Sequence, residues 1–448
     1  MAKLIKCSTI IKNDRGEIMA FTDIERKVLE VIDKNSEKII SIGKKVLDNP
    51  ELGYREFETS ALVKECFHEL GLDVKDSIAY TGVKGTLGKG DDFNLCIIGE
   101  LDSIMCPDHP KANIRSGAAH ACGHNIQIAN MLGSAIGLAK SGVMNDLSGK
   151  ITFMATPAEE YVELEYRKSL KAEGKIKYFS GKQQLIHEGE FDDIDAAIMV
   201  HANPESPEKL VCLDAESVGF VTKKITFLGK SVHAAKPYDG VNALNAAALA
   251  ILGIHTARER FREEDKVKVH FIVTNGGDVV NVVPSKVTLE CQVRALNTPA
   301  MMKASDDVDA AIKGAAMMVG AEVEIETIVG YQPFNQSKEL GKVFESVAEE
   351  FMDKEAIHRD IHMTGSSDIG DVSYLLPTIQ PMVGGFVGQL HAKEFCTSDD
   401  YIAYVLPAKL MALTAVRLLE DGAKLGKEIK NGFKPLMTKE EYLKLLEG

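Results

Sequence analysis

The sequence predicts an α/β fold with a mostly parallel sheet, into which a smaller α+β domain is inserted. Three short apolar runs, at 94–102, 150–156 and 195–200, are separated by segments with helical periodicity. This alternation is typical of strands buried in a parallel sheet. After Pro204 the pattern changes, and shorter strands and helices alternate in a different order. The predicted domains are 1–216 together with 331–448, and 217–330 as the insert.

The segment before the first apolar run is predicted to be helical. Apolar residues recur at helical spacing from Phe21 to Val46, and the turn-forming segment 49–53 follows. A further helix carries Leu62 on its apolar face and is expected to end at Gly71.

Polar residues follow each of the three apolar runs directly. Asp102 ends the first run, Glu159 and Glu160 follow the second, and His201 follows the third. Ligands bind at the carboxyl ends of the strands in open α/β sheets, so these side chains are expected to converge.

The segment 119–125 carries a thiol and two imidazoles within five residues. Cys122 and His124 are separated by Gly123, which lets the backbone bend so that both side chains reach one ion. Asn125 is expected to cap the helix that follows. On this segment alone, a metal site and a buried cysteine beside surface histidines remain alternatives. The convergence of the acids and His201 on the same turn favours the metal site.

The insert has the order β-α-β-β-α-β, which is a ferredoxin-like motif. The first domain resumes near Tyr331 and ends in a helix at 406–419. The expected elements of the insert are strands at 218–227, 267–273, 286–295 and 321–329, helices at 243–259 and 300–319, and a loop at 229–237.

Composition restricts the possible partners and the compartment. The 448 residues carry a net charge of -14, which argues against nucleic acid and anionic membrane surfaces as partners. The eight cysteines are scattered with no CxxC pair, and the N-terminal segment lacks the features of a secretory signal. A cytoplasmic protein without a membrane partner is therefore expected.

Taken together, the motifs resemble those of the aminoacylase–carboxypeptidase superfamily of co-catalytic metallohydrolases. Within it the chain is most similar to the hippurate-hydrolase and auxin-conjugate amidohydrolase branch. The matching stretches span nearly the whole chain in family order. They are Pro50-Glu51-Leu52-Gly53, His120-Ala-Cys-Gly-His124, Pro157-Ala-Glu-Glu160, His201, Gly229 to Pro237, Asn281-Val-Val-Pro284, Val293-Arg294, Gly365-Ser-Ser-Asp368 and Leu390-His391.

The finer resemblance is to aminobenzoyl-glutamate hydrolase and the β-alanyl dipeptidases, because Asn125 replaces an Asp common in hippurate-type members. The chain also departs from the family. Glu100 stands where an Asp is usual, and Ser367 stands where many members have Glu. Most visibly, the charged segment 161–177 replaces a Gly-rich turn. This segment is interpreted either as a solvated helical excursion or as a specificity element in which Glu163 or Glu165 lines the cleft.

The resemblance implies a ligand set for two divalent metal ions. Thiolate, imidazole and carboxylate ligands suit zinc, with manganese, nickel or cobalt as alternatives. The thiolate would be shared between the two ions. The implied ligands are Cys122, His124, Glu160, His201 and His391.

The resemblance also assigns the other roles. Glu159 is the expected general base, and His233 is expected to stabilise the tetrahedral oxyanion from a neighbouring subunit. Asn281 and Arg294 are expected to bind the substrate, Arg294 as a bidentate clamp on a carboxylate. Two further residues, Asp102 and His120, are expected to orient the ligands.

The implied function is that of a metal-dependent amidohydrolase or peptidase that acts on linear amides. It would cleave the amide bond of an N-acyl amino acid or dipeptide-like small molecule. Aminobenzoyl-glutamate hydrolase and β-alanyl-type dipeptidase activities are the alternatives within this class. A non-catalytic ligand-binding relative is the alternative outside it. The inserted domain is expected to serve as a lid and to form a homodimer.

Overall fold

The computed structural model describes residues 21–204, 210–359 and 365–447. The chain forms two compact units. Within the described residues, the first unit consists of 21–204, 210–215, 335–359 and 372–436. The second unit consists of 216–334, 365–371 and 437–447.

A mixed six-stranded sheet forms the centre of the first unit. Its strand order is β1-β2-β6-β3-β7-β15, and the pairs β6–β3, β3–β7 and β7–β15 are parallel. The strands are β1 (Asp73–Ile78), β2 (Gly82–Gly88), β3 (Asn94–Glu100), β6 (Lys150–Thr156), β7 (Ala196–Met199) and β15 (Thr378–Ile379). The three apolar runs are therefore adjacent parallel strands, and the predicted fold class is confirmed. The antiparallel β1–β2 hairpin at one edge was not predicted from the sequence.

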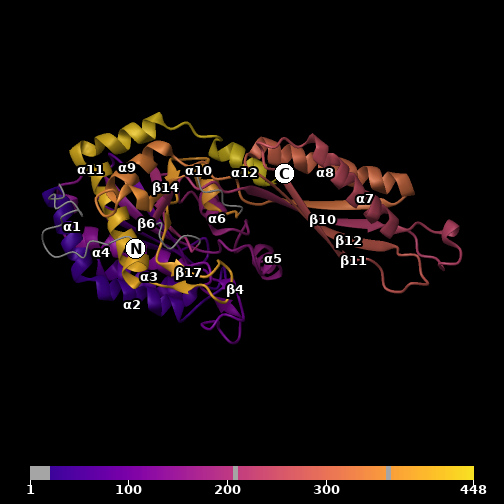
Figure 1. Cartoon of the computed structure of the whole chain (residues 1–448), viewed down its shortest axis with the longest axis horizontal. Helices are drawn as coiled ribbons and strands as arrows, with labels where there is room; N and C mark the ends of the chain where they lie inside the picture. Colours follow the sequence, from indigo (N-terminus) through magenta and orange to yellow (C-terminus); the bar gives the residue numbers. More distant parts are fainter. Residues whose placement is uncertain (1–20, 205–209, 360–364, 448) are drawn as a thin grey trace. The chain divides into compact units, whose positions relative to one another are not determined.

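A buried helix, α4 (His124–Lys140), is the main core element beside this sheet. It packs against β3 and against α1 (Asp23–Lys34), α2 (Ser36–Leu47) and α11 (Leu406–Gly432), which cluster together in Figure 1. Its residues from His124 to Leu138 are all buried, because helices and sheet cover it on every side. The remaining longer helices of the unit are α3 (Phe57–Glu69), α5 (Leu164–Ala172), α6 (Gly181–Glu188) and α9 (Lys338–Ala348).

By length and composition alone, the helical segment Tyr401–Gly432 could cross a membrane. However, 89% of its most apolar 18-residue stretch is buried inside the protein. It is a core helix of the first unit. Its first five residues, Tyr401–Val405, form a π-helix, and α11 is broken by non-helical backbone at 420–423.

Short strands complete the first unit. Four of them form a second small sheet in the order β14-β9-β16-β8, and the others form two-stranded ladders. Their bounds are β4 (Ile104–Met105), β5 (Ala118–Ala119), β8 (His201–Ala202), β9 (Val211–Leu213), β14 (Ile357–Arg359), β16 (Met382–Val383), β17 (Phe386–Val387) and β18 (Cys396–Thr397).

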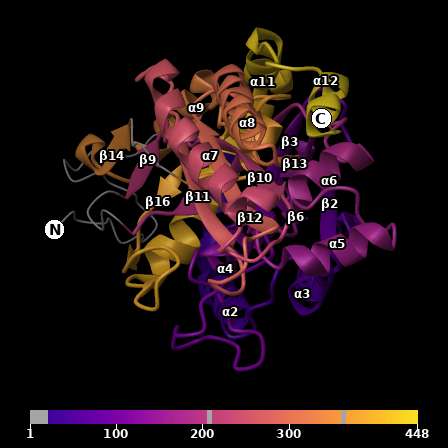
Figure 2. The same cartoon turned by 90° about the vertical axis from the view of Figure 1, so that its right-hand side faces the viewer.

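The second unit is a four-stranded antiparallel sheet in the order β11-β12-β10-β13, with two helices packed on it. Figure 1 shows α7 and α8 along one face of this sheet, and Figure 2 shows the two helices side by side. The order along the chain is the predicted β-α-β-β-α-β. The elements are β10 (Gly219–Leu228), α7 (Ala243–Ala257), β11 (Lys268–Asn275), β12 (Lys286–Ala295), α8 (Thr298–Val319) and β13 (Glu322–Val329).

The second unit also contains residues that the sequence analysis placed in the first domain. The helix α12 (Lys439–Glu447) packs against β13, and the buried Tyr442 hydroxyl donates a hydrogen bond to Asp371 Oδ1 at 2.7 Å. These contacts group 365–371 and 437–447 with the second unit, although the predicted boundaries assigned 331–448 to the first domain.

Candidate metal centre

Four side chains of the first unit, those of His124, Glu160, His201 and His391, lie around the Cys122 sulfur. Cys122 Sγ lies 3.5 Å from His201 Nε2 and 3.3 Å from His391 Nε2. His391 Nε2 in turn lies 3.3 Å from Glu160 Oε1. The possible ligand atoms form three groups, each within 4.8 Å. Cys122 belongs to two of them, one with His124 and His201 and one with Glu160 and His391, and the third consists of Glu100, His124 and Glu159.

A left-handed glycine turns the chain between the thiol and the imidazole. Gly123 has φ 86° and precedes His124, the first residue of α4. A Cβ at Gly123 would lie 2.8 Å from the Cβ of Ala202, so the backbone approaches β8 more closely than another residue would allow. The predicted cap at Asn125 is wrong, because Asn125 lies inside the helix. Its amide donates to Tyr404 Oη at 3.0 Å, so its side chain is used in core packing.

His124 is held so that only one ring nitrogen points into the cluster. Its Nδ1 donates to the Asp102 carbonyl at 2.9 Å and lies 3.3 Å from Asp102 Oδ1. His124 Nε2 is 3.1 Å from Glu100 Oε2, but without hydrogen-bond geometry. Within the described part of the chain, His124 Nε2 and Glu160 Oε1 are buried with no hydrogen-bond partner. Buried polar atoms rarely remain unsatisfied, so this pair fits ligands of a metal ion.

The charges in the cluster favour the thiolate form of Cys122. Burial and the Glu160 carboxylate raise the pKa of this thiol, but His201 and His124 outweigh them and lower it to about 6. Burial lowers the pKa of His391, while its contacts with Cys122 and Glu160 raise it to about 10. A thiolate beside imidazoles and a carboxylate is the donor set that zinc-like ions prefer.

The turn 157–160 directs the two neighbouring glutamates to different places. Glu160 N–H donates to Asp102 Oδ2 at 2.9 Å, so Asp102 holds both this turn and His124. Glu160 faces His391, whereas Glu159 Oε2 lies 3.9 Å from His124 Nε2. Ala158 has φ 54°, a left-handed conformation that costs a non-glycine residue on the order of 1–3 kcal/mol. The surrounding contacts must maintain it.

A fully buried ion pair behind His124 was not predicted from the sequence. Lys182 Nζ on α6 lies 2.6 Å from Glu100 Oε1, and both side chains are completely buried. Gln127 donates to the other oxygen of Glu100 at 2.7 Å. Burial alone raises the pKa of Glu100, but Lys182 and His124 lower it to about 2. Glu100 is therefore a carboxylate that sits directly against a proposed metal ligand.

His120 is buried close to the cluster. Burial lowers the pKa of its imidazole to about 3, so the ring is neutral at physiological pH. Among the described residues neither ring nitrogen has a hydrogen-bond partner, so no orienting contact from His120 to a ligand is seen.

The other three predicted site residues lie in the second unit. His233 Nδ1 accepts from Ala235 N–H at 3.0 Å, and the Asn281 carbonyl accepts from Ala234 N–H at 2.9 Å. The loops that carry His233 and Asn281 are therefore neighbours. Arg294 lies on β12, where burial lowers the pKa of its guanidinium and Nε donates to Gln292 at 2.9 Å.

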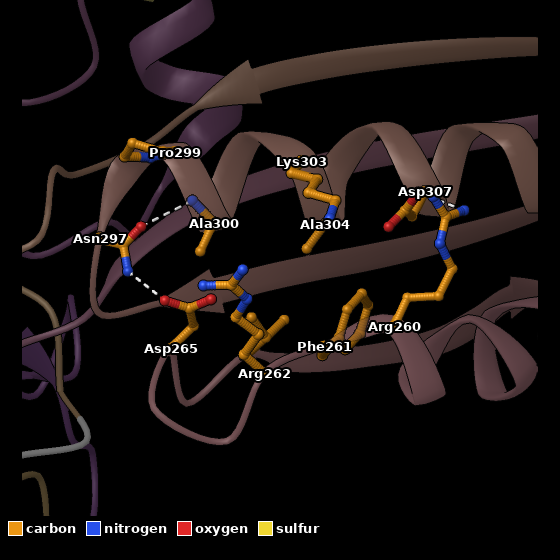
Figure 3. A pocket seen from close by; sticks show the side chains of 11 residues that line it. Arg260, Phe261, Arg262, Asp265, Asn297, Pro299, Ala300, Lys303, Ala304 and Asp307 are labelled. Carbon is orange, nitrogen blue, oxygen red and sulfur yellow. Dashed lines mark hydrogen bonds and ion pairs between the residues drawn. The ribbon is translucent and has the colours of Figure 1, made fainter.

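A separate pocket of the second unit lies beside the start of α8 (Figure 3). Three of its charged side chains already have partners, because Arg260 contacts Asp307 at 2.8 Å and Asp265 accepts a hydrogen bond from Asn297 at 2.7 Å. None of the predicted site residues lines this pocket. The candidate catalytic and metal-ligating side chains of the first unit lie instead at the Cys122 cluster.

Comparison with known proteins also indicates a metal-dependent hydrolase. A family model described as Peptidase family M20/M25/M40 matches residues 97–413. The chain is 25% identical over 424 residues to "IAA-amino acid hydrolase ILR1-like 2" of Arabidopsis thaliana, covering 90% of this chain and 91% of that protein. It is 28% identical over 269 residues to "N-acetyl-L-cysteine deacetylase" of Bacillus subtilis, covering 58% of this chain and 60% of that protein.

Solved structures share the fold. A dinuclear metal-binding peptidase of the M20 family from Bacillus subtilis matches with a TM-score of 0.69 at 19% identity, covering 86% of this chain and 99% of that one. An aminobenzoyl-glutamate utilization protein from Klebsiella pneumoniae matches with a TM-score of 0.64 at 18% identity, covering 88% and 99%.

Proposed function

The chain belongs to peptidase family M20/M25/M40, and we propose that it hydrolyses the amide bond of an N-acyl amino acid. As a member of this family, it is a metal-dependent amidohydrolase. Two observations together support this substrate class: the side chains of the metal-ligand cluster are all present, and relatives are named for N-acyl amino acids.

Each residue of the cluster has a place in amide hydrolysis. Bound metal ions would polarise the scissile carbonyl and increase the acidity of the attacking water. Glu159 stands beside the ligand His124 without being committed to the Cys122 groups. It takes a proton from the water and delivers that proton to the leaving amine. Asp102 fixes the geometry of both steps, because it holds His124 and the backbone of the glutamate turn.

The remaining roles follow from the resemblance. His233 stabilises the oxyanion that forms at the scissile carbonyl, and Asn281 and Arg294 bind the substrate. A guanidinium suits the carboxylate that every N-acyl amino acid carries. We also propose zinc as the metal, because Cys122 contributes a soft thiolate ligand to two of the groups.

A substrate panel tests the activity. The metal-loaded protein should hydrolyse at least one of a set of N-acyl amino acids, aminobenzoyl-glutamate and β-alanyl dipeptides, and a chelator should abolish turnover. The ranking of kcat/KM within the panel distinguishes the N-acyl amino acid proposal from the two alternatives. Tight binding without turnover by any member would favour a non-catalytic ligand-binding protein instead.

Cys122 provides a test of the shared ligand. Removing a residue that only supports a ligand typically weakens metal affinity by about 10–100-fold, so Cys122→Ser should cost at least that much. It should affect both ions, because Cys122 belongs to two of the ligand groups. Metal titration of the apo protein measures this effect.

Alkylation provides an independent readout of the same thiol. Cys122 should resist alkylation in the metal-loaded protein and react after chelation, while the exposed Cys396 should react in both states. Rapid modification of Cys122 in fully loaded protein would argue against its role as a ligand.

We further propose that the protein is a cytoplasmic homodimer. All the described cysteines are free thiols, which is typical of a reducing compartment. The second unit exposes apolar side chains, among them Val280 at 99% and Ile272 at 51%, which a partner subunit would cover. Sedimentation equilibrium should give twice the chain mass, and a monomer at micromolar concentration would contradict the dimer.

A further inference from the structure

The segment after the glutamate pair folds into α5 and turns one arginine completely inward. Its acidic residues have other partners. Glu163 accepts from Arg55 Nε at 3.0 Å, and Glu165 pairs with Lys168 at 2.8 Å while 88% exposed. Neither arrangement supports the idea that these acids select the substrate. Arg167, in contrast, is fully buried.

The guanidinium of Arg167 binds the backbone on both sides of Glu159. Its Nη1 donates to the carbonyl of Ala158 at 3.4 Å and to the carbonyl of Phe179 at 2.5 Å. Its Nη2 donates to the carbonyl of Glu160. Arg167 thus binds the backbone carbonyls of the residues before and after Glu159, the proposed base.

No carboxylate of the described residues pairs with Arg167. The guanidinium instead faces the rings of Tyr54 at 5.5 Å and Tyr161 at 6.0 Å. The guanidinium of an arginine carries a positive charge. Burying an ion costs several kcal/mol unless good contacts offset that cost. Here the offsetting contacts are backbone carbonyls, two of which belong to the glutamate turn.

The backbone N–H groups of the same turn are held by the carboxyl side chains of Glu56 and Asp102. Glu56 Oε1 accepts from Ala158 N–H at 2.8 Å, and Asp102 Oδ2 accepts from Glu160 N–H at 2.9 Å. The amides of Ala158 and Glu160 are therefore held by acids, while their carbonyls are held by Arg167. This explains how the turn keeps the left-handed backbone at Ala158.

The matching motif 50–53 makes room for this arrangement. A Cβ on Gly53 would lie 2.4 Å from Arg167 Nη2 and 2.9 Å from Ala158 Cα. Gly53 does not have a positive φ, so space, rather than backbone conformation, requires glycine here. Gly53 therefore leaves space for both the guanidinium of Arg167 and the backbone of Ala158.

We propose that Arg167 is a positioning residue that fixes the backbone from Ala158 to Glu160 and so holds Glu159 in place for proton transfer. The helix α5, which follows the glutamate pair, thereby supports the turn that carries Glu159. The inference rests on the proposed role of Glu159 in amide hydrolysis.

The test compares Arg167→Ala and Arg167→Lys with the double variant Glu165→Ala/Lys168→Ala, all as zinc-loaded full-length protein. A misplaced catalytic group costs up to about 100-fold in rate, so kcat should fall by roughly 10–100-fold in both Arg167 variants. KM should change less than about threefold, and metal stoichiometry should stay unchanged. The double variant removes a surface pair of the same helix and should match the wild type. Guanidinium ion should partly restore kcat in Arg167→Ala only.

Lysine keeps the charge but lacks the rigid planar fork with which arginine spans the carbonyls of Ala158 and Glu160. If Arg167→Ala fails to fold, Arg167→Lys therefore supplies the test. Wild-type kcat in a folded Arg167→Lys, or loss of metal in proportion to kcat, would overturn the proposal. Hydrogen exchange at the backbone amides of residues 158–160 gives a readout without substrate, and exchange should become faster in both Arg167 variants. If the wild type cleaves no amide but exchange is faster in the Arg167 variants, the proposed function is refuted. In that case the role of Arg167 in fixing the backbone of the turn still holds. Unchanged exchange would overturn that role.

Discussion

Glu159→Gln is expected to lower kcat by about 10²–10⁴-fold, the usual contribution of a general acid–base group, while both metal ions stay bound. The amide keeps the size of the side chain but cannot accept the proton from water. Glu159 lies 3.9 Å from His124 Nε2 and forms a group with Glu100 and His124, but it belongs to neither group around the Cys122 thiolate. Because those two groups keep all their ligands, metal affinity should be largely preserved. Single-turnover kinetics and elemental analysis of the same preparation measure the two quantities.

Glu160→Gln is the matched control, because it changes the adjacent residue in the same way. Glu160 faces Cys122 and His391, so this variant should lose metal as well as rate. Equal metal content and equal rates in the two variants would show that the roles of base and ligand are wrongly divided.

Lys182→Met should lower the free energy of unfolding by about 3–5 kcal/mol, because it leaves the Glu100 carboxylate buried without its partner. Both side chains are completely buried and their charged atoms are 2.6 Å apart. Urea unfolding of the metal-free protein measures the change without a contribution from metal binding. Combining Lys182→Met with Glu100→Gln should recover part of the lost stability, because no charge then remains unpaired.

Lys38→Met is the control for this prediction. Lys38 and Glu69 also form an ion pair, at 2.9 Å, but their side chains are 45% and 55% exposed. Exposed pairs contribute about 0–1 kcal/mol. A Lys182→Met effect no larger than that of Lys38→Met would contradict the burial argument.

The sequence predicted the sheet and the convergence of side chains for a clear physical reason. Parallel strands are buried on both faces, so their apolar runs are continuous, and the polar residue that ends each run marks the sheet edge. Asp102, Glu160 and His201 were found in this way, and the Cys122–His124 turn stood out because its residue types are rare. The hairpin β1–β2 was missed because its exposed strand has no such run.

The residues that support the site could not be predicted. Lysine and arginine are almost always exposed, so nothing in the sequence distinguished Lys182 and Arg167 from surface residues. Their burial depends on which carboxylate or carbonyl faces them from another segment. The expected cap at Asn125 failed for a related reason, since a tertiary contact with Tyr404 places this residue inside the helix.

The second unit is built from segments that are far apart in the sequence, and this affects how it can fold during synthesis on the ribosome. Its sheet is finished at β13, but α12 and the Tyr442–Asp371 hydrogen bond come from segments that are translated much later. A nascent chain that has just completed β13 exposes the surface that α12 later covers. The unit can therefore reach its final state only after 437–447 emerge, and a chain truncated before this segment should retain the sheet but aggregate more readily.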